Sequence, residues 1–92
     1  MKITKRLDIK NRLGLHARAA ALLVQTVSRF SSKVKISKDG RVVNGRSIIG
    51  LLTLGAAKGS RVRVEVKGND AEESLKAIEE LFEKRFDEGD ST

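Results

Sequence analysis

The stretch 61-RVRVEVK-67 decides the fold that this sequence predicts. Valine alternates with charged residues, so that Val62, Val64 and Val66 share one face and the charged residues share the other. Because side chains of a β-strand point alternately to opposite faces, this pattern predicts a strand with one buried face and one face in water. A strand of that kind is typical of an antiparallel sheet that is covered on a single side.

Three other segments fit further strands of the same sheet, because their apolar residues alternate with polar ones. These segments are residues 3–9, 33–37 and 41–44. The last two are joined by Asp39-Gly40, which is the strongest kind of short sequence signal for a β-hairpin turn.

Between and after the strands lie three segments in which apolar residues recur at helical spacing. These segments are residues 17–29, 47–55 and 69–86. Ser47 is the expected N-cap of the short second helix, since a serine oxygen accepts a hydrogen bond from the first turn. Asn69 and Glu72 have the spacing of a capping box at the start of the third helix.

The order of the predicted elements is therefore β-α-β-β-α-β-α. We expect an α+β fold, an open-faced β-sandwich in which a four-stranded, mostly antiparallel sheet carries three helices on one face. A chain of 92 residues fits a single domain over residues 1–92. Residues 87–92 are expected to be a frayed tail.

The composition narrows the class of protein. The chain has no cysteine, which excludes disulfides and thiol chemistry and fits a reducing cytoplasm. No segment approaches the roughly 18 consecutive apolar residues of a membrane span, and the N-terminus does not resemble a signal peptide. We therefore expect a cytoplasmic protein that does not insert into membranes.

The charge is unevenly distributed along the chain. The net charge is +7; residues 1–69 hold 16 basic and 3 acidic residues, whereas residues 70–92 hold 3 basic and 9 acidic ones. A basic body suggests an acidic partner, a phosphorylated ligand or nucleic acid. Sheet-borne aromatics for base stacking are missing, since Phe30, Phe82 and Phe86 fall on or beside predicted helices, and we therefore expect no nucleic-acid partner.

The segment 14-GLHARAA-20 contains the only histidine of the chain. If the first helix begins at Ala17, His16 is its N-cap, where free backbone N–H groups and the helix dipole disfavour a positive charge. The ring should then be mostly neutral near pH 7, and a neutral imidazole is a nucleophile. An anion on the ring would lie over the free N–H groups, and Arg18 could add a charge-assisted hydrogen bond.

Other chemistries have little support around this histidine. The chain has no second histidine, and no carboxylate lies near His16 in the sequence, so that neither a catalytic triad nor a metal site is indicated. We expect no metal and no cofactor. Phosphoryl acceptance is the sharpest chemistry that remains, and a surface histidine without a task is the alternative on spacing alone.

Two segments resemble a known family. The stretch 11-NRLGLHARAAALL-23 looks like the active-site segment of HPr, the histidine phosphocarrier of the phosphoenolpyruvate-dependent phosphotransferase system. The stretch 43-VNGRSIIGLLTLGAAKGSRVRVEVKG-68 looks like the segment around that family's regulatory serine. The resemblance covers residues 3–86, and the predicted element order is that of the family's open-faced sandwich.

The resemblance implies a bacterial phosphoprotein that is a carrier rather than an enzyme and acts as a monomer. His16 would accept a phosphoryl group on Nδ1 from phosphorylated enzyme I and pass it to a histidine of an EIIA-type domain in sugar transport. Arg18 would pair with the phosphoryl group, and the backbone N–H groups of Ala17, Arg18 and Ala19 would hold it.

The same resemblance assigns roles around the second helix. Ile48, Ile49 and Leu52 match the family's apolar docking patch for partners, and an exposed apolar cluster is typical of an interface. Ser47 matches the serine that a dedicated kinase phosphorylates in some bacteria. A plain N-cap is the alternative for Ser47.

Some features separate this chain from the usual pattern. The family usually has proline where this chain has Ala19, which keeps a backbone N–H in the first helical turn. The ending 82-FEKRFDEGD-90 resembles the nitrogen-type paralogue NPr, whereas residues 43–55 are closer to the sugar-system type. Both branches stay open, as does a regulatory interaction module of the nitrogen-type branch.

Overall fold

The computed structural model describes residues 1–88. Its elements follow the predicted order. They are β1 (Lys2–Asp8), α1 (Ala17–Val27), β2 (Lys33–Lys38), β3 (Arg41–Asn44), α2 (Ile48–Leu52), β4 (Arg61–Lys67) and α3 (Ala71–Glu83), followed by a short 3₁₀ turn at Arg85–Asp87.

The four strands form one sheet in the order β1-β4-β2-β3, and all three neighbouring pairs are antiparallel. The predicted α+β open-faced sandwich is confirmed. β4, the strand with the clearest alternation, lies between β1 and β2, and its three valines are almost completely buried. The inner face of the sheet is therefore built around this strand.

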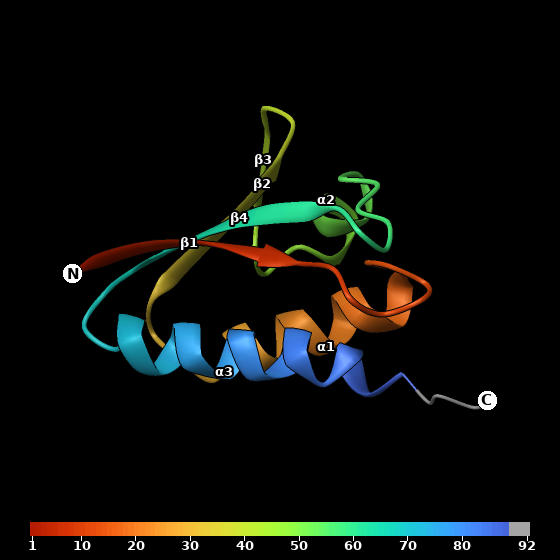
Figure 1. Cartoon of the computed structure of the whole chain (residues 1–92). Helices are drawn as coiled ribbons and strands as arrows, with labels where there is room; N and C mark the ends of the chain where they lie inside the picture. The colour runs from red at the N-terminus through yellow and green to blue at the C-terminus, as the bar shows by residue number, and fades with distance from the viewer. Residues whose placement is uncertain (89–92) are drawn as a thin grey trace.

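The helices lie on one side of the sheet and leave the other side open. α1 and α3 run side by side beneath the strands (Figure 1), while the short α2 contacts α1 and β3. Leu23 of α1, Ile36 of β2 and Ile78 of α3 are all fully buried in the core between the two layers. No helix within residues 1–88 is long and apolar enough to cross a bilayer.

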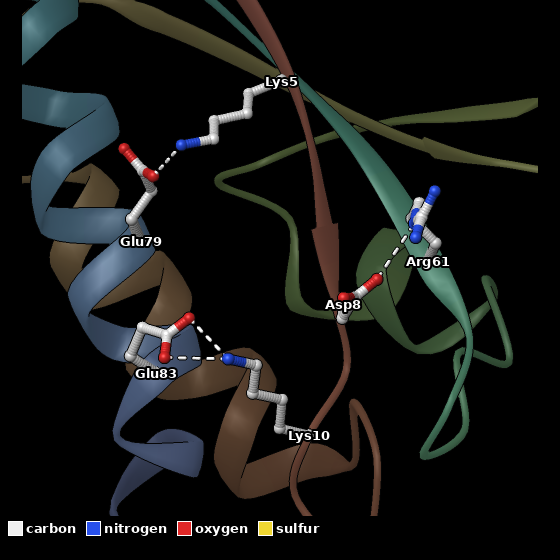
Figure 2. A network of polar contacts seen from close by, with 6 residues as sticks. All are labelled: Lys5, Asp8, Lys10, Arg61, Glu79 and Glu83. Carbon is white, nitrogen blue, oxygen red and sulfur yellow. Dashed lines mark hydrogen bonds and ion pairs between the residues drawn. The ribbon is translucent and has the colours of Figure 1, made fainter.

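Polar contacts tie the first strand and the loop after it to α3. Lys5 pairs with Glu79, and Lys10 Nζ donates to both carboxylate oxygens of Glu83 at 2.6 and 2.8 Å (Figure 2). These pairs are largely exposed, and exposed pairs contribute about 0–1 kcal/mol each. The packed core, rather than these pairs, holds α3 against the sheet.

The β2–β3 hairpin forms as the sequence predicts. Asp39 and Gly40 both have positive φ angles, 51° and 83°. A two-residue hairpin turn of type I′ needs positive φ at both central positions, and Asp-Gly meets that need at little steric cost.

The predicted capping box of α3 is wrong. The N-cap is Asp70 rather than Asn69, and its side chain makes no capping bond. The Asp70 carboxylate instead accepts from the N–H groups of Ser31 (2.8 Å) and Ser32 (2.9 Å) and from the Ser32 hydroxyl. The loop before β2 offers this carboxylate three donors, so that Asp70 joins that loop to the start of α3.

The end of the described chain is more ordered than the sequence suggests. Phe86 is 1% exposed and its ring centroid lies 4.9 Å from that of Phe82. Asp87 N donates to Lys84 O at 3.1 Å, and the carboxylate of Glu88 is bound by three donors described below. Residues 87 and 88 of the expected frayed tail thus make hydrogen bonds to the rest of the domain, while residues 89–92 lie outside the described part.

The hydrogen bonds of the Asp70 carboxylate predict that the free energy of unfolding falls in acid. The hydrogen bond from the Ser32 side chain, followed by the one from the Ser31 backbone, holds the pKa of Asp70 below its usual value. A lowered native pKa means that the stabilisation is present above the ordinary pKa of about 4 and is lost as pH falls through the lowered value. Asp70→Ala should lower the free energy of unfolding at pH 7, and this deficit should shrink at pH 3.

Urea denaturation at the two pH values measures both effects. Glu80→Gln is the matched control, because Glu80 is exposed on the same helix and its side chain has no polar partner among residues 1–88. A deficit for Asp70→Ala that is equally large at pH 3 and pH 7 would contradict the role given to this carboxylate.

Candidate functional site

His16 is the N-cap of α1, as the sequence predicts. Its backbone is extended, with φ −81° and ψ −178°, and its side chain makes no capping hydrogen bond. The carbonyl oxygen of His16 accepts the first helical hydrogen bond from Ala20 N at 2.8 Å. The imidazole is therefore positioned by the helix start without being used to cap it.

The first turn of α1 offers free donors to an anion. Within residues 1–88, no acceptor is bound to the backbone N–H groups of Ala17, Arg18 and Ala19. Proline in place of Ala19 would leave only two such groups. These donors and the positive end of the helix dipole favour an anion beside the ring of His16.

Arg18 lies in the same turn with an exposed side chain. No carboxylate among the described residues pairs with its guanidinium. This charge is therefore available to an anion that reaches the helix start. The structure thus brings the predicted groups, the histidine ring, the guanidinium and the three neighbouring N–H donors, to one helix end.

The carbonyl oxygen of Gly14 orients the histidine ring. It accepts from Asn11 Nδ2 at 2.7 Å, from the backbone N–H of His16 at 2.9 Å, and it lies 3.0 Å from His16 Nδ1. A carbonyl oxygen only accepts, so this contact requires a proton on Nδ1. In the neutral ring the lone pair is then on Nε2.

Gly14 can be replaced by no other residue without a shift of the backbone. Its φ is +67°, and a Cβ built on it would lie 2.5 Å from the carbonyl oxygen of Ala56. Leu15 N also donates to that oxygen at 2.8 Å. The segment before His16 is therefore pressed against the segment that follows α2, and only glycine permits this approach.

The close approach leaves a shallow hollow of about 200 Å³ beside the histidine. Its lining comes from both segments: Leu13, Leu15, His16, Gly55, Ala56 and Ala57. The histidine ring thus borders a small, mostly apolar depression at the protein surface.

Glu88 is the functional candidate that the sequence did not indicate. Its carboxylate accepts from Arg12 N at 2.7 Å, Leu13 N at 3.1 Å and Asn11 Nδ2 at 3.2 Å. Desolvation raises the pKa of Glu88, but the hydrogen bonds from Asn11, Leu13 and Arg12 and the charge of His16 outweigh it, so that the pKa lies below its usual value.

A chain of contacts therefore runs from the end of the described chain to the histidine. Glu88 binds the Asn11 amide, which donates to the Gly14 carbonyl, which holds the His16 ring. Glu88 is separated from Asn11 by 77 positions. No carboxylate lies near His16 in the sequence. In the folded chain, however, the docking of the C-terminal segment links Glu88 to His16 through Asn11 and Gly14.

The predicted docking residues are on the surface of α2. Ile48, Ile49 and Leu52 are 40%, 77% and 41% exposed, whereas Leu51 of the same helix is fully buried. Leu13, which sequence reasoning missed, is 56% exposed and borders the hollow at His16. Exposed apolar side chains thus occur both on α2 and beside the histidine.

Ser47 is the N-cap of α2, as predicted. Its hydroxyl oxygen accepts from Gly50 N at 2.9 Å, and its own N–H donates to Asn44 O at 3.0 Å.

Over residues 1–88, the structure contains no group of three or more His, Cys, Asp or Glu side chains that could hold a metal. The site is therefore built from one histidine, one arginine and backbone donors.

This fold and this site define a class of small α+β proteins that present a histidine at a helix start with unbound backbone N–H donors. A family model, the PTS HPr component phosphorylation site, matches residues 3–84. The chain is 49% identical over 82 residues to a phosphocarrier protein HPr of Xylella fastidiosa, which covers 89% of this chain and 92% of the relative.

Other relatives and a solved structure indicate the same family. An HPr of Treponema pallidum is 43% identical and covers 94% of this chain and 98% of its own. The crystal structure of an HPr from Thermoanaerobacter tengcongensis superposes with a TM-score of 0.90 at 45% identity, over 95% of this chain and 98% of the other. The chain belongs to the HPr family of phosphocarrier proteins of the phosphotransferase system.

The contacts of Glu88 predict that this carboxylate holds the loop before His16. Glu88→Gln removes the negative charge, so the amides of Arg12 and Leu13 should exchange with solvent several-fold faster, as followed by NMR. In the wild type the same protection should be lost as pH falls through the lowered pKa of Glu88, since a protonated carboxyl accepts less strongly.

Glu80→Gln is again the matched control and should leave both amides unchanged. If the amides of Arg12 and Leu13 keep their protection in Glu88→Gln, the Glu88 carboxylate does not hold the loop before His16.

Proposed function

We propose that the protein accepts a phosphoryl group on His16 from phosphorylated enzyme I and passes it to a histidine of an EIIA-type domain. The observation that carries this proposal is the position of His16 at a helix start with unbound N–H donors. We also propose that residues 1–92 form a single HPr-like domain that acts as a monomer in the cytoplasm.

In the first transfer, the N–P bond on the donor histidine breaks as an N–P bond forms on His16. The donor imidazole keeps the electron pair of the broken bond and can take up a proton, while the attacking nitrogen of His16 needs a free lone pair, so its proton must first move to the other ring nitrogen. The phosphoryl oxygens then lie near the N–H groups of Ala17, Arg18 and Ala19, and the Arg18 guanidinium can bind them. The second transfer reverses these steps toward the acceptor.

Transfer to Nδ1, which the family resemblance implies, places a condition on the ring. Nδ1 lies 3.0 Å from Gly14 O and carries the proton in this arrangement. The ring must therefore leave the carbonyl and give up that proton before Nδ1 can attack. Gly14 would then act as a latch that keeps the idle ring in one orientation.

We further propose that both partners dock on the exposed apolar residues of α2 and on Leu13, which borders the hollow beside His16. Ile48, Ile49 and Leu52 of α2 supply the exposed apolar surface, and such patches are typical of interaction sites. Positive charge on residues 1–69 steers acidic partner surfaces toward the site.

Phosphorylation of Ser47 is the regulation that this arrangement would permit. A phosphate on Ser47 adds about −1.5 to −2 charges next to Ile48 and Ile49. The phosphate is attached to the Oγ that accepts from Gly50 N, at the start of α2. The added negative charge should weaken docking of an acidic partner.

Labelled phosphoenolpyruvate and a cognate enzyme I test the proposal directly. The wild type should take up acid-labile label, and His16→Ala should take up none. Arg18→Gln should lower the transfer rate about tenfold or more, the loss of one charge-assisted hydrogen bond. Arg29→Gln, at the other end of the same helix, is the matched control and should transfer at the wild-type rate.

Label that persists in His16→Ala, or a wild type that stays unlabelled with its cognate enzyme I, would overturn the proposal.

A further inference from the structure

The open face of the sheet is strongly cationic. The outward side chains of β1, β4 and β2 alternate with those on the helix side of the sheet, and their basic members are Lys2, Arg6, Lys33, Lys35, Arg61, Arg63 and Lys67. The carboxylates of this face in the three strands are Asp8 and Glu65. None of this surface belongs to the histidine site.

Like charges stand directly opposite one another across the strands. Lys67 is paired in register with Lys2 on one side and with Lys33 on the other, and Arg63 is paired with Arg6. Directly opposed like charges destabilise a sheet. An anion bound across such a row would relieve this repulsion.

The two carboxylates of this face neutralise only part of its charge, since one of them pairs with Lys2 of the lysine row and the other pairs outside both rows. Asp8 binds Arg61 at 2.9 Å (Figure 2), and Glu65 binds Lys2 at 3.5 Å. Within the part of the chain that the structure describes, no carboxylate pairs with the remaining five cations: Arg6, Lys33, Lys35, Arg63 and Lys67.

The two rows require an extended anion. Arg6 and Lys2 are four residues apart on β1, which places the rows about 13 Å from each other at the rise of a strand. At the arginine row, the surface forms a hollow of about 440 Å³ whose basic lining residues are Arg6, Lys38, Arg61 and Arg63. A single phosphate reaches one row only, whereas a polyanion reaches both.

The composition of the face indicates which kind of polyanion it binds. Protein interfaces have an apolar centre, often with aromatic residues, and are poor in lysine. The large exposed apolar side chain on this face is Val42, which lies on the outer strand β3. A cationic face without an apolar centre suits a nucleic-acid backbone better than it suits a protein surface. Single-strand binding would need aromatic stacking, which a duplex backbone does not.

We propose that the open face of the sheet binds the phosphate backbone of a nucleic-acid duplex without reading its sequence. This binding is separate from the phosphocarrier function, since it uses none of the residues at His16. The absent aromatic residues speak against base stacking only, and the proposal therefore departs from the sequence-based expectation that the chain has no nucleic-acid partner.

Salt dependence of duplex binding is the test. Fluorescence anisotropy of a labelled 20-base-pair DNA duplex is measured between 50 and 200 mM NaCl. If all five unpaired cations engage, log K should fall with log[salt] with a slope of about −4.5, that is about 0.9 for each phosphate neutralised. The double variant Arg6→Gln/Arg63→Gln should make the slope shallower by about 2.

Lys58→Gln/Lys76→Gln is the matched control, because it removes the same charge from exposed positions outside the sheet. It should leave the slope unchanged, and so should His16→Ala, which separates this proposal from the phosphocarrier function. Thermal unfolding checks the fold, and Arg6→Gln/Arg63→Gln should be at least as stable as the wild type because it relieves an opposed pair.

Three results would each overturn the proposal. The first is no binding at 50 mM NaCl. The second is an equal loss in both double variants, which would mean diffuse attraction by net charge. The third is competition by polyglutamate as effective, charge for charge, as unlabelled duplex, which would mean that the face suits an acidic protein.

Discussion

The carbonyl group of Gly14 is the point on which the arrangement of the histidine site depends. It receives the Asn11 amide, the His16 backbone N–H and the His16 ring nitrogen, all within 3.0 Å. It is available to all three because Gly14 has a positive φ and lies against Ala56 without a side chain. The ring orientation, the start of α1 and the contact with the segment after α2 all follow from this one residue.

The two faces of the sheet have different tasks in this account. The helical layer supplies the buried core, and at one end it presents the histidine with the donors that the proposed phosphoryl transfer uses. The open face presents paired rows of cations, to which the proposed duplex binds without a covalent bond. The same excess of positive charge serves both, at the helix start through Arg18 and on the sheet through the lysines and arginines of β1, β4 and β2.

Much of the fold could be predicted from local patterns. The alternation in 61–67, the Asp39-Gly40 turn and the Ser47 cap each depend on neighbouring residues only, and each was confirmed. The capping box at Asn69 failed because a distant loop supplied Asp70 with three donors. Glu88 was missed for the same reason, since its partners lie at the opposite end of the chain. Local signals therefore place His16, and long-range contacts decide how it is held.

The tautomer of His16 tests the role of Gly14 most directly. Two-dimensional ¹⁵N NMR of the imidazole, on the unphosphorylated protein at a pH where the ring is neutral, distinguishes a protonated Nδ1 from a protonated Nε2. The hydrogen bond to Gly14 predicts a proton on Nδ1 and a bare Nε2. A neutral ring that carries its proton on Nε2 would contradict the account, because Nδ1 could then make no hydrogen bond to the carbonyl of Gly14.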